Sequence, residues 1–109
     1  MTNAPIVGHW SCDLLTERVE WDEGVYDLFG LPRGVPLDRA TAIRRYDRPS
    51  LIAMECLRTQ AILDKSGFTL DVRITTVSGE PRVIRIVAAV ESEGGKAVRL
   101  AGTKTIVTD

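Results

Sequence analysis

Few residues in the chain could perform catalysis. The single histidine, His9, falls in a short predicted strand, and neither a Ser-His-Asp nor a Cys-His arrangement can be built around it. Two pairs of carboxylates are close in sequence, Asp22 with Glu23 and Glu91 with Glu93. The first pair suits the start of a helix and the second a solvated turn, rather than a general acid and its base. We therefore predict that the domain itself has no catalytic residues and is not an enzyme.

The other reactive side chains are two cysteines. Cys12 and Cys56 are far apart in sequence and do not have the spacing of a metal-binding motif. We expect two reduced thiols that pack as small apolar side chains, and we expect no metal site. The opening residues, Met1–Pro5, lack the charged and apolar regions of a signal peptide. A cytoplasmic location is therefore the expectation.

The composition is that of one ordinary globular domain. The chain has 109 residues, of which 44% are apolar and 27% are charged. The formal net charge is −1 and no stretch is strongly basic, so the charges do not favour a nucleic-acid partner. No apolar run approaches the ~20 residues that a membrane-spanning helix needs. We expect neither nucleic acid nor membrane as a partner.

The last third of the chain, residues 68–107, reads as three antiparallel strands joined by two tight turns. Apolar and polar residues alternate, as in Phe68-Thr69-Leu70-Asp71-Val72-Arg73-Ile74, which is typical of a sheet with one buried face. Gly79 and the Gly94-Gly95 pair favour the turns. Two shorter strands, residues 7–13 and 18–21, lie near the N-terminus. Because a lone hairpin is marginal in water, we expect them to dock onto the other three and form a five-stranded sheet.

Helical segments separate the two groups of strands. Asp22 is a good N-cap for the first, and Gly30 can end that helix with a positive φ. Asp38 can cap a short helical turn, and Ser50 is expected to cap the longest helix. The expected inner stripe of that longest helix is Met54, Leu57 and Ala61, with Cys56 as a further candidate. This order predicts an α+β domain in which short helices pack on one face of a five-stranded antiparallel sheet.

Six segments along the chain follow, in order, the motifs of a known family. They are Gly8–Leu14, Val19–Trp21, Val25–Pro32, Phe68–Ile74, Gly79–Arg82 and Gly94–Thr103. The first three are similar to G-x-W-x-x-D-L…W-S-x-x-x-Y-x-x-x-G-x-x, and the last three to F-x-x-x-Y-R-I…D-G-x-x-R and G-x-x-x-x-L-x-G-x. The ordered set covers nearly the whole chain and resembles the PAS domain, specifically its PAS fold-3 type.

The resemblance implies a sensor domain of a signalling protein, such as a sensory-box histidine kinase of a two-component system. Two departures qualify it. Where the family often has H-P-x-D before the long helix, this chain has Tyr46–Ser50. Where the family usually ends in D-I-T-E, Ile106 replaces the Asp, so output coupling cannot run through that carboxylate. Residues 1–109 are expected to be a single PAS-like domain, either part of a longer signalling protein or a stand-alone module.

The same resemblance raises the question of a cofactor. Flavin-binding members of the LOV type carry a cysteine in a G-x-N-C-R-F-L-Q helix, and no such run is present here. Haem-binding members use a histidine on the long helix, and residues 50–65 contain none. Met54 at this spacing is more typical of core packing than of an axial ligand. We therefore expect neither flavin nor haem.

In PAS domains the helices and the inner face of the sheet enclose a pocket. The predicted lining here is apolar, suits a small apolar ligand, and includes no converging charged cluster. It consists of Trp21, Leu28, Phe29, Met54, Leu57, Leu70, Ile86 and Leu100. The alternative is that these residues simply fill the core, because protein interiors are close-packed.

The opposite face of the predicted sheet is unusually apolar for a face exposed to water. Such a patch is typical of a partner site, here a homodimer contact or a neighbouring signalling domain. The predicted contact residues are Val83, Arg85, Val87, Ala89, Ala97 and Ala101. Two functions remain open: a sensory module that binds a small ligand, and a ligand-free dimerisation scaffold. A cone-shaped transport or cyclase-like domain is the fold-level alternative, and a polar pocket lining would favour it.

Overall fold

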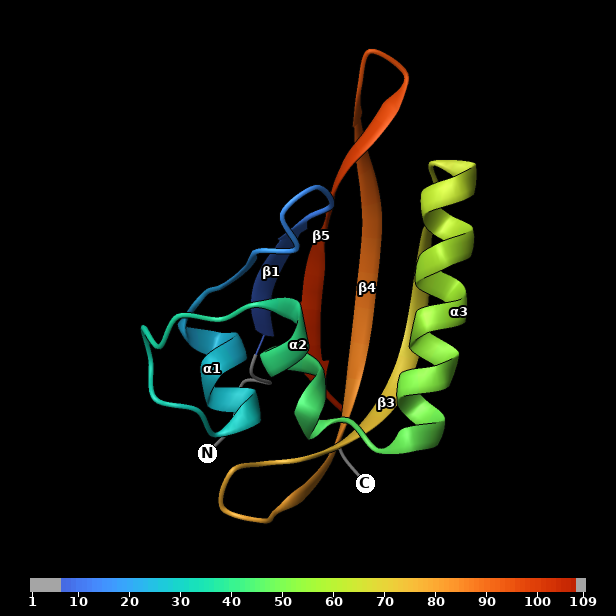
Figure 1. Cartoon of the computed structure of the whole chain (residues 1–109). Helices are drawn as coiled ribbons and strands as arrows, with labels where there is room; N and C mark the ends of the chain where they lie inside the picture. The colour runs from blue at the N-terminus through green and yellow to red at the C-terminus, as the bar shows by residue number, and fades with distance from the viewer. Residues whose placement is uncertain (1–6, 108–109) are drawn as a thin grey trace.

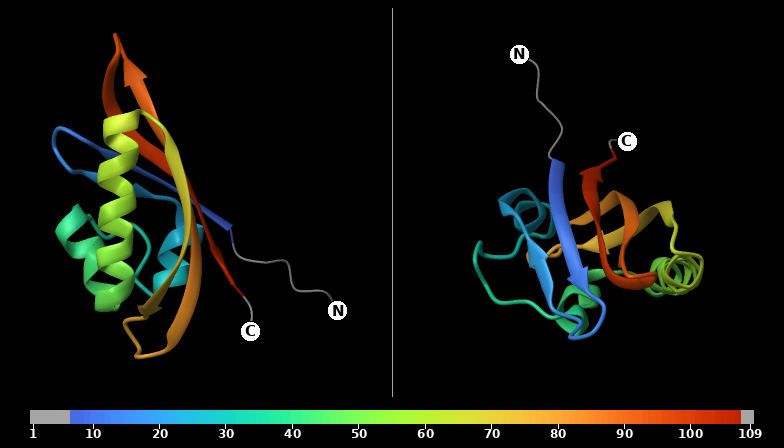
Figure 2. Two further views of the ribbon diagram at one scale, coloured as in Figure 1. Left: turned by 90° about the vertical axis from the view of Figure 1, so that its right-hand side faces the viewer. Right: turned by 90° about the horizontal axis from the view of Figure 1, so that it is seen from above.

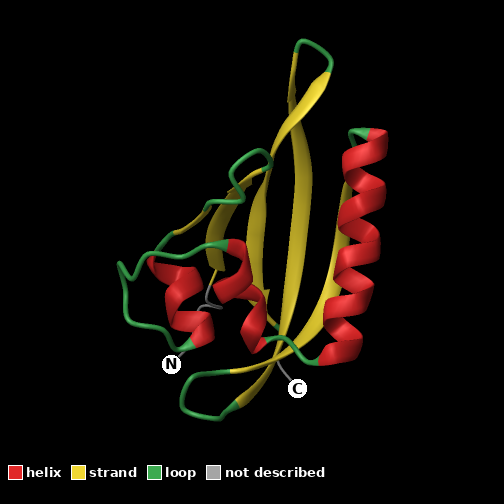
Figure 3. Ribbon diagram, viewed as in Figure 1, coloured by secondary structure: helices red, strands yellow, loops and turns green. Residues whose placement is uncertain are grey.

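The computed structural model describes residues 7–107 and has two layers, a twisted antiparallel sheet and a layer of helices on one of its faces (Figures 1 and 3). The strands are β1 (Val7–Asp13), β2 (Val19–Trp21), β3 (Gly67–Thr75), β4 (Pro81–Glu93) and β5 (Lys96–Ile106). The helical segments are α1 (Glu23–Phe29), α2 (Arg39–Ala42), the 3-10 turn η1 (Ile43–Arg45) and α3 (Arg48–Asp64). The α+β architecture predicted from the sequence is confirmed.

All five strands form one sheet in the order β2-β1-β5-β4-β3. Strand β1 pairs antiparallel with both β2 and β5, so Trp10 lies opposite Trp21 on one side and Gly102 on the other. The first and last described strands therefore lie side by side near the middle of the sheet (Figure 2). This confirms that the N-terminal hairpin docks onto the three C-terminal strands.

The first two helices begin at the predicted caps. The Asp22 side chain accepts a hydrogen bond from the backbone N–H of Val25 at 3.2 Å, and Gly30 ends α1 with φ of +70°. Asp38 accepts a hydrogen bond from the N–H of Thr41 at 2.8 Å and so caps α2. These short polar side chains satisfy backbone donors that a helix leaves unpaired at its first turn.

The start of α3 differs from the prediction. Its N-cap is Asp47, whose Oδ1 accepts a hydrogen bond from the N–H of Ser50 at 2.9 Å. Ser50 lies inside the first turn, and its Oγ accepts a hydrogen bond from the N–H of Arg73 at 2.8 Å. The prediction of Ser50 as the cap was wrong because Pro49 is tolerated within the first turn, so the helix begins earlier. Ser50 instead fastens α3 to β3.

The core lies between the helices and the inner face of the sheet. Its fully buried side chains include Val25, Leu28, Phe29, Ile84 and Leu100. Cys12 is buried, as predicted, whereas Cys56 is exposed. The prediction for Cys56 was wrong because the buried side of α3 is the one that carries Met54 and Ala61.

Among residues 7–107, no helix is long and apolar enough to cross a membrane. The interpretation of Met1–Pro5, and the last two positions compared with the D-I-T-E ending, concern residues outside the described part of the chain.

Candidate functional site

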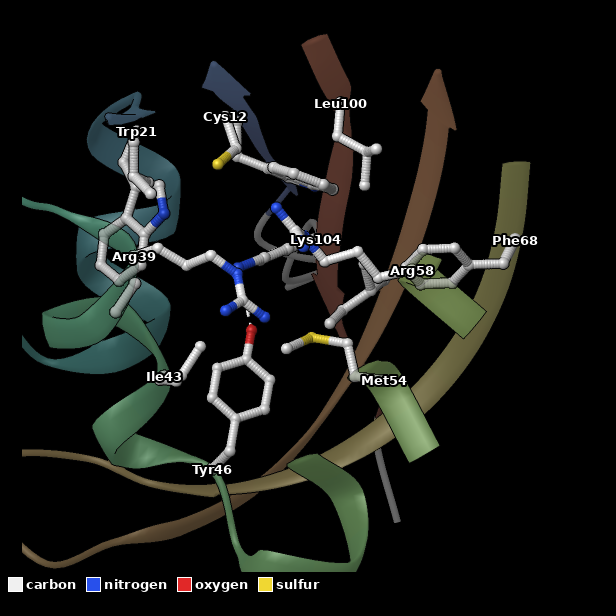
Figure 4. Close-up of a pocket in the computed structure, with 14 residues that line it drawn as sticks. Cys12, Trp21, Arg39, Ile43, Tyr46, Met54, Arg58, Phe68, Leu100 and Lys104 are labelled. Atoms are coloured by element: carbon white, nitrogen blue, oxygen red, sulfur yellow. Dashed lines mark hydrogen bonds between the residues drawn. The ribbon is translucent and has the colours of Figure 1, made fainter. Parts of the chain in front are cut away.

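A cavity of about 50 Å³ lies between the helices and the inner face of the sheet. Its lining comes from all five strands and from α2, η1 and α3. The lining residues, most of them labelled in Figure 4, are Trp10, Cys12, Val19, Trp21, Arg39, Ala42, Ile43, Tyr46, Met54, Arg58, Phe68, Ile86, Leu100 and Lys104. Apolar and cationic side chains both line the cavity.

Lys104 is the least expected member of this lining. It lies on β5 at the inward-facing register shared by Leu100 and Gly102, and the whole residue is only 6% exposed. Its Nζ donates a hydrogen bond to the hydroxyl of Tyr46 at 3.0 Å. Within residues 7–107, no carboxylate approaches this Nζ to ion-pair distance. Lys104 is therefore a buried amine with one neutral hydrogen-bond partner.

Four aromatic rings surround the Lys104 amine. Its Nζ lies 5.2 Å from the ring centroid of Trp10, 5.3 Å from Trp21, 5.0 Å from Phe29 and 5.6 Å from Tyr46. Ring faces at this distance attract a cation through their quadrupoles, and this partly offsets the loss of water around the ammonium. The rings come from β1, β2, α1 and the segment after η1, so the fold gathers them from separate elements.

Burial changes the protonation of this group. Loss of solvation lowers the pKa of Lys104 to about 7, because a dry environment disfavours the charged form. Burial likewise raises the pKa of the Tyr46 hydroxyl, which keeps that partner neutral. Near neutral pH the amine therefore exchanges readily between its charged and neutral forms.

Two arginines reach the same cavity from the helices. The side chains of Arg39 on α2 and Arg58 on α3 are 17% and 19% exposed. Arg39 pairs with Glu55, and Arg58 meets Glu17 more loosely at 3.8 Å. Figure 4 shows both guanidinium groups pointing into the cavity beside Lys104. Burial, followed by the charge of Arg58, lowers the pKa of Arg39, which indicates that these cations repel one another.

Cys12 lies beside these cations on β1. Burial raises the pKa of its thiol, and the charge of Arg58 opposes that effect without cancelling it. The thiol therefore stays neutral and adds no negative charge to the site.

The two tryptophans of the lining differ in hydrogen bonding. Nε1 of Trp10 donates to the backbone oxygen of Thr103 at 3.2 Å. Trp21 is only 9% exposed, and its Nε1 is buried without an acceptor in the described part of the chain. Buried polar groups are nearly always hydrogen-bonded, so an unpaired indole N–H at a cavity wall marks a place for an acceptor.

The structure brings together only part of the predicted lining. Trp21, Met54, Ile86 and Leu100 line the cavity. Leu28 and Phe29 are fully buried in the core beside it, whereas Leu57 and Leu70 are half-buried and do not line it. The side of α3 that meets the cavity carries Met54 and Arg58, which are four residues apart.

The expectation of no converging charged cluster was wrong. Lys104, Arg39 and Arg58 all line the cavity. The sequence carried a signal for Lys104, because strict alternation from Leu100 through Gly102 to Ile106 places residue 104 on the same inward face. For Arg58 the signal was its position four residues after Met54 on the same helix, and for Arg39 there was no comparable signal.

The outer face of the sheet is a mixed surface. Val87 is 41% exposed, and its neighbours across the sheet are Thr69 and Thr103. Among the other predicted contact residues, Ala89 is exposed and lies opposite Ala101. Val83, Ala97 and Ala101 are half-buried, and Ala97 lies near the tip of the β4–β5 hairpin. Arg85 is paired with Asp71 at 2.8 and 3.1 Å. The apolar part is thus a narrow stripe bordered by threonines and ion pairs.

No protein-family model and no curated protein matches the chain. Solved structures do match it. The N-terminal domain of a diguanylate cyclase with a PAS/PAC sensor from Marinobacter aquaeolei superposes with a TM-score of 0.81 at 18% identity, over 90% of this chain and 92% of that one. A sensory box histidine kinase/response regulator from Burkholderia thailandensis gives 0.79 at 16% identity, over 94% and 77%.

A LOV domain from a blue-light activated histidine kinase of Erythrobacter litoralis also matches, with a TM-score of 0.71 at 12% identity, over 98% of this chain and 100% of that one. The chain therefore has the PAS fold. This confirms the resemblance read from its motifs. The cavity lining is partly polar, which was the feature expected to favour a cone-shaped transport or cyclase-like domain. The strand order nevertheless matches the PAS fold, so the lining does not indicate that alternative fold.

The LOV-type neighbour makes flavin the cofactor to consider, and the cavity does not fit it. A volume of about 50 Å³ is far below the ~300–1,000 Å³ of pockets that hold drug-sized ligands. The cysteine that lines the cavity, Cys12, lies on a strand, and Cys56 on α3 is exposed. Within the described residues, no group of three or more His, Cys, Asp or Glu side chains is placed to hold a metal ion.

Proposed function

We propose that this domain is the sensory module of a signal-transduction protein such as a histidine kinase, located in the cytoplasm. A small ligand occupies the cavity, and its presence is passed to a neighbouring domain or a second copy through the outer face of the sheet. The domain itself acts by binding and performs no catalytic step.

The observation that carries the proposal is a pair of incompletely partnered polar groups at the cavity. In the described chain Lys104 has a hydroxyl but no carboxylate as partner, and Nε1 of Trp21 has no acceptor. Burying such groups without partners costs stability, and a site for a ligand is a physical reason to retain them. The likeness to sensor domains of signalling proteins supports the same function.

The cavity is joined to the outer face by the strands themselves. Side chains alternate along β5, so Lys104 faces the cavity while Thr103 and Thr105 face the other side. A ligand that changes the position of Lys104 therefore acts on the strand that also carries Ala97 and Ala101 of the outer stripe. Switching a population from 1:99 to 99:1 needs about 5.5 kcal/mol of differential binding, so contacts to several lining groups are required.

A ligand-free dimerisation scaffold is the second candidate function. The small cavity volume of about 50 Å³ favours it, because the core is nearly filled. In that case the outer stripe, with Val87 at its centre, would carry the whole function through homodimer contact.

A thermal-shift screen of small compounds against the wild type and Met54→Trp separates these two functions. Met54 lines the cavity on α3 and is 8% exposed, so the indole would occupy the ligand's space. We expect ligands to raise the melting temperature of the wild type and to lose that effect in Met54→Trp. The overpacked variant should itself be about 1–3 kcal/mol less stable.

Met54→Leu is the matched control, because it conserves volume and should keep the response to ligands. Shifts of equal size in Met54→Trp would contradict a site in this cavity. A wild type that responds to no compound, together with stable self-association, would favour the scaffold.

A further inference from the structure

The charges at the cavity do not balance. Its cationic side chains are Lys104, Arg39 and Arg58, and the carboxylates within 4 Å of any of them in the described chain are Glu55 and Glu17. Three cations thus face two carboxylates, and the unpaired one is the deeply buried Lys104. A single negative charge beside its Nζ would complete the site, because buried charges are normally paired.

A neighbouring aromatic side chain carries a hydrogen-bond donor that is also free. Nε1 of Trp21 has no acceptor, and the Trp21 ring centroid lies 5.3 Å from Nζ of Lys104. The corresponding donor of Trp10 is satisfied by the backbone oxygen of Thr103. The lining therefore offers one ammonium and one N–H from neighbouring side chains, which suits an acceptor with two oxygens.

The size of the cavity and the apolar residues of its lining limit the anion further. A water molecule needs at least ~10–15 Å³ of cavity volume, so a cavity of about 50 Å³ accommodates roughly three to five heavy atoms. Ala42, Ile43 and Leu100 line the cavity and would contact an alkyl group. An inorganic anion would leave these side chains without an apolar partner.

From this arrangement we propose that the cavity binds a short-chain monocarboxylate, held by Nζ of Lys104 and Nε1 of Trp21, with its alkyl end against the apolar side chains of the lining. The proposal rests on the proposed sensory function and names its ligand class. Arg58, which meets Glu17 only at 3.8 Å, supplies a further cation in the lining.

Binding of the anion is coupled to protonation of Lys104. The groups that face its amine are Cys12 from β1, Tyr46 before α3, Arg39 from α2 and Arg58 from α3, while α1 presents the uncharged ring of Phe29. None of them is a carboxylate, and the pKa of Lys104 in the free protein is about 7. A carboxylate favours the charged amine, so above pH 7 its binding takes up one proton. Affinity should then fall up to about tenfold for each pH unit.

The test compares carboxylates with their neutral amides of the same shape. Acetate and propionate, with acetamide and propionamide as controls, are titrated at constant ionic strength while the melting temperature is followed. We expect the carboxylates alone to stabilise the wild type, by about 10 °C at a hundredfold excess over Kd. Lys104→Met should lose the response, and Trp21→Phe should bind acetate about tenfold more weakly.

Lys96→Met removes an exposed lysine at the β4–β5 turn and should keep the full response. Equal shifts from the amides, or an acetate response retained in Lys104→Met, would overturn the carboxylate class while leaving ligand sensing intact. A melting temperature that changes with none of the four compounds would also overturn the carboxylate class. The screen with the Met54 variants would then decide the sensory function separately.

Discussion

Lys104 is the residue on which the interpretation of the cavity depends. A lysine amine at this depth, with a hydroxyl as its hydrogen-bond partner, loses far more hydration than it regains. The four surrounding rings offset part of that lost hydration energy. The part that is not offset lowers the pKa of Lys104. The folded state therefore gives up stability at this position, which is expected where a group is retained for binding.

The pH dependence of unfolding tests this cost. Lys104 has a pKa of about 7 when folded, against ~10.4 for an unfolded lysine. Between these values the unfolded state binds the extra proton, so the free energy of unfolding should rise with pH by at most about 1.4 kcal/mol per unit. Lys104→Met should lack this rise and be about 1–4 kcal/mol more stable at pH 6. Urea denaturation across pH 6–10 measures both.

Lys96→Met again serves as the control and should behave as the wild type, because Lys96 is exposed. A wild type whose stability is flat above pH 7, or a Lys104→Met protein that is less stable at pH 6, would show that the buried amine is well accommodated.

At the scale of elements, local rules located the strands and the first two helix starts. Asp22 and Asp38 are short polar residues before a helical stretch, and each accepts the expected backbone hydrogen bond. The third start was misassigned because Asp47 and Ser50 are both good caps. In the structure the Ser50 hydroxyl accepts a hydrogen bond from the backbone N–H of Arg73, which lies on a strand distant in sequence, and Asp47 is the cap.

The cavity could be predicted only in part for a related reason. Alternation along β5 predicts that Leu100 points inward. The same rule predicts an inward Lys104, which the expected lining did not include. Arg39 of α2 looks like an ordinary solvated residue, since no local pattern distinguishes a guanidinium that bends toward the core. Leu57 and Leu70 were included because they are apolar, yet the packing of α3 against β3 leaves them beside the cavity.

At the scale of the whole molecule, the sheet order explains why the site lies where it does. Placing β1 next to β5 brings Trp10 and Cys12 beside Leu100 and Lys104, so both ends of the described chain form the cavity floor. The helices close it from one side only, which leaves the other face of the same strands open to solvent (Figure 2). A change in the cavity and a contact on the outer face thus share one set of strands.

The outer stripe makes a prediction for self-association. Val87→Glu would place a charge in the middle of the proposed contact, where desolvating it is costly, and should weaken self-association at least tenfold. Sedimentation equilibrium measures the change. Leu63→Glu, at a 70% exposed position on α3, adds the same charge elsewhere and should leave the association constant unaltered. An unchanged monomer–dimer balance in Val87→Glu would remove the stripe as a homodimer contact.

The most direct measurement is an NMR titration of the Lys104 side chain, with and without acetate. The buried, unpaired amine should titrate near pH 7 in the free protein, and acetate should move the midpoint upward by at least one pH unit. A midpoint near the ~10.4 of a solvated lysine, or one that acetate does not move, would contradict the cavity as a binding site for carboxylates.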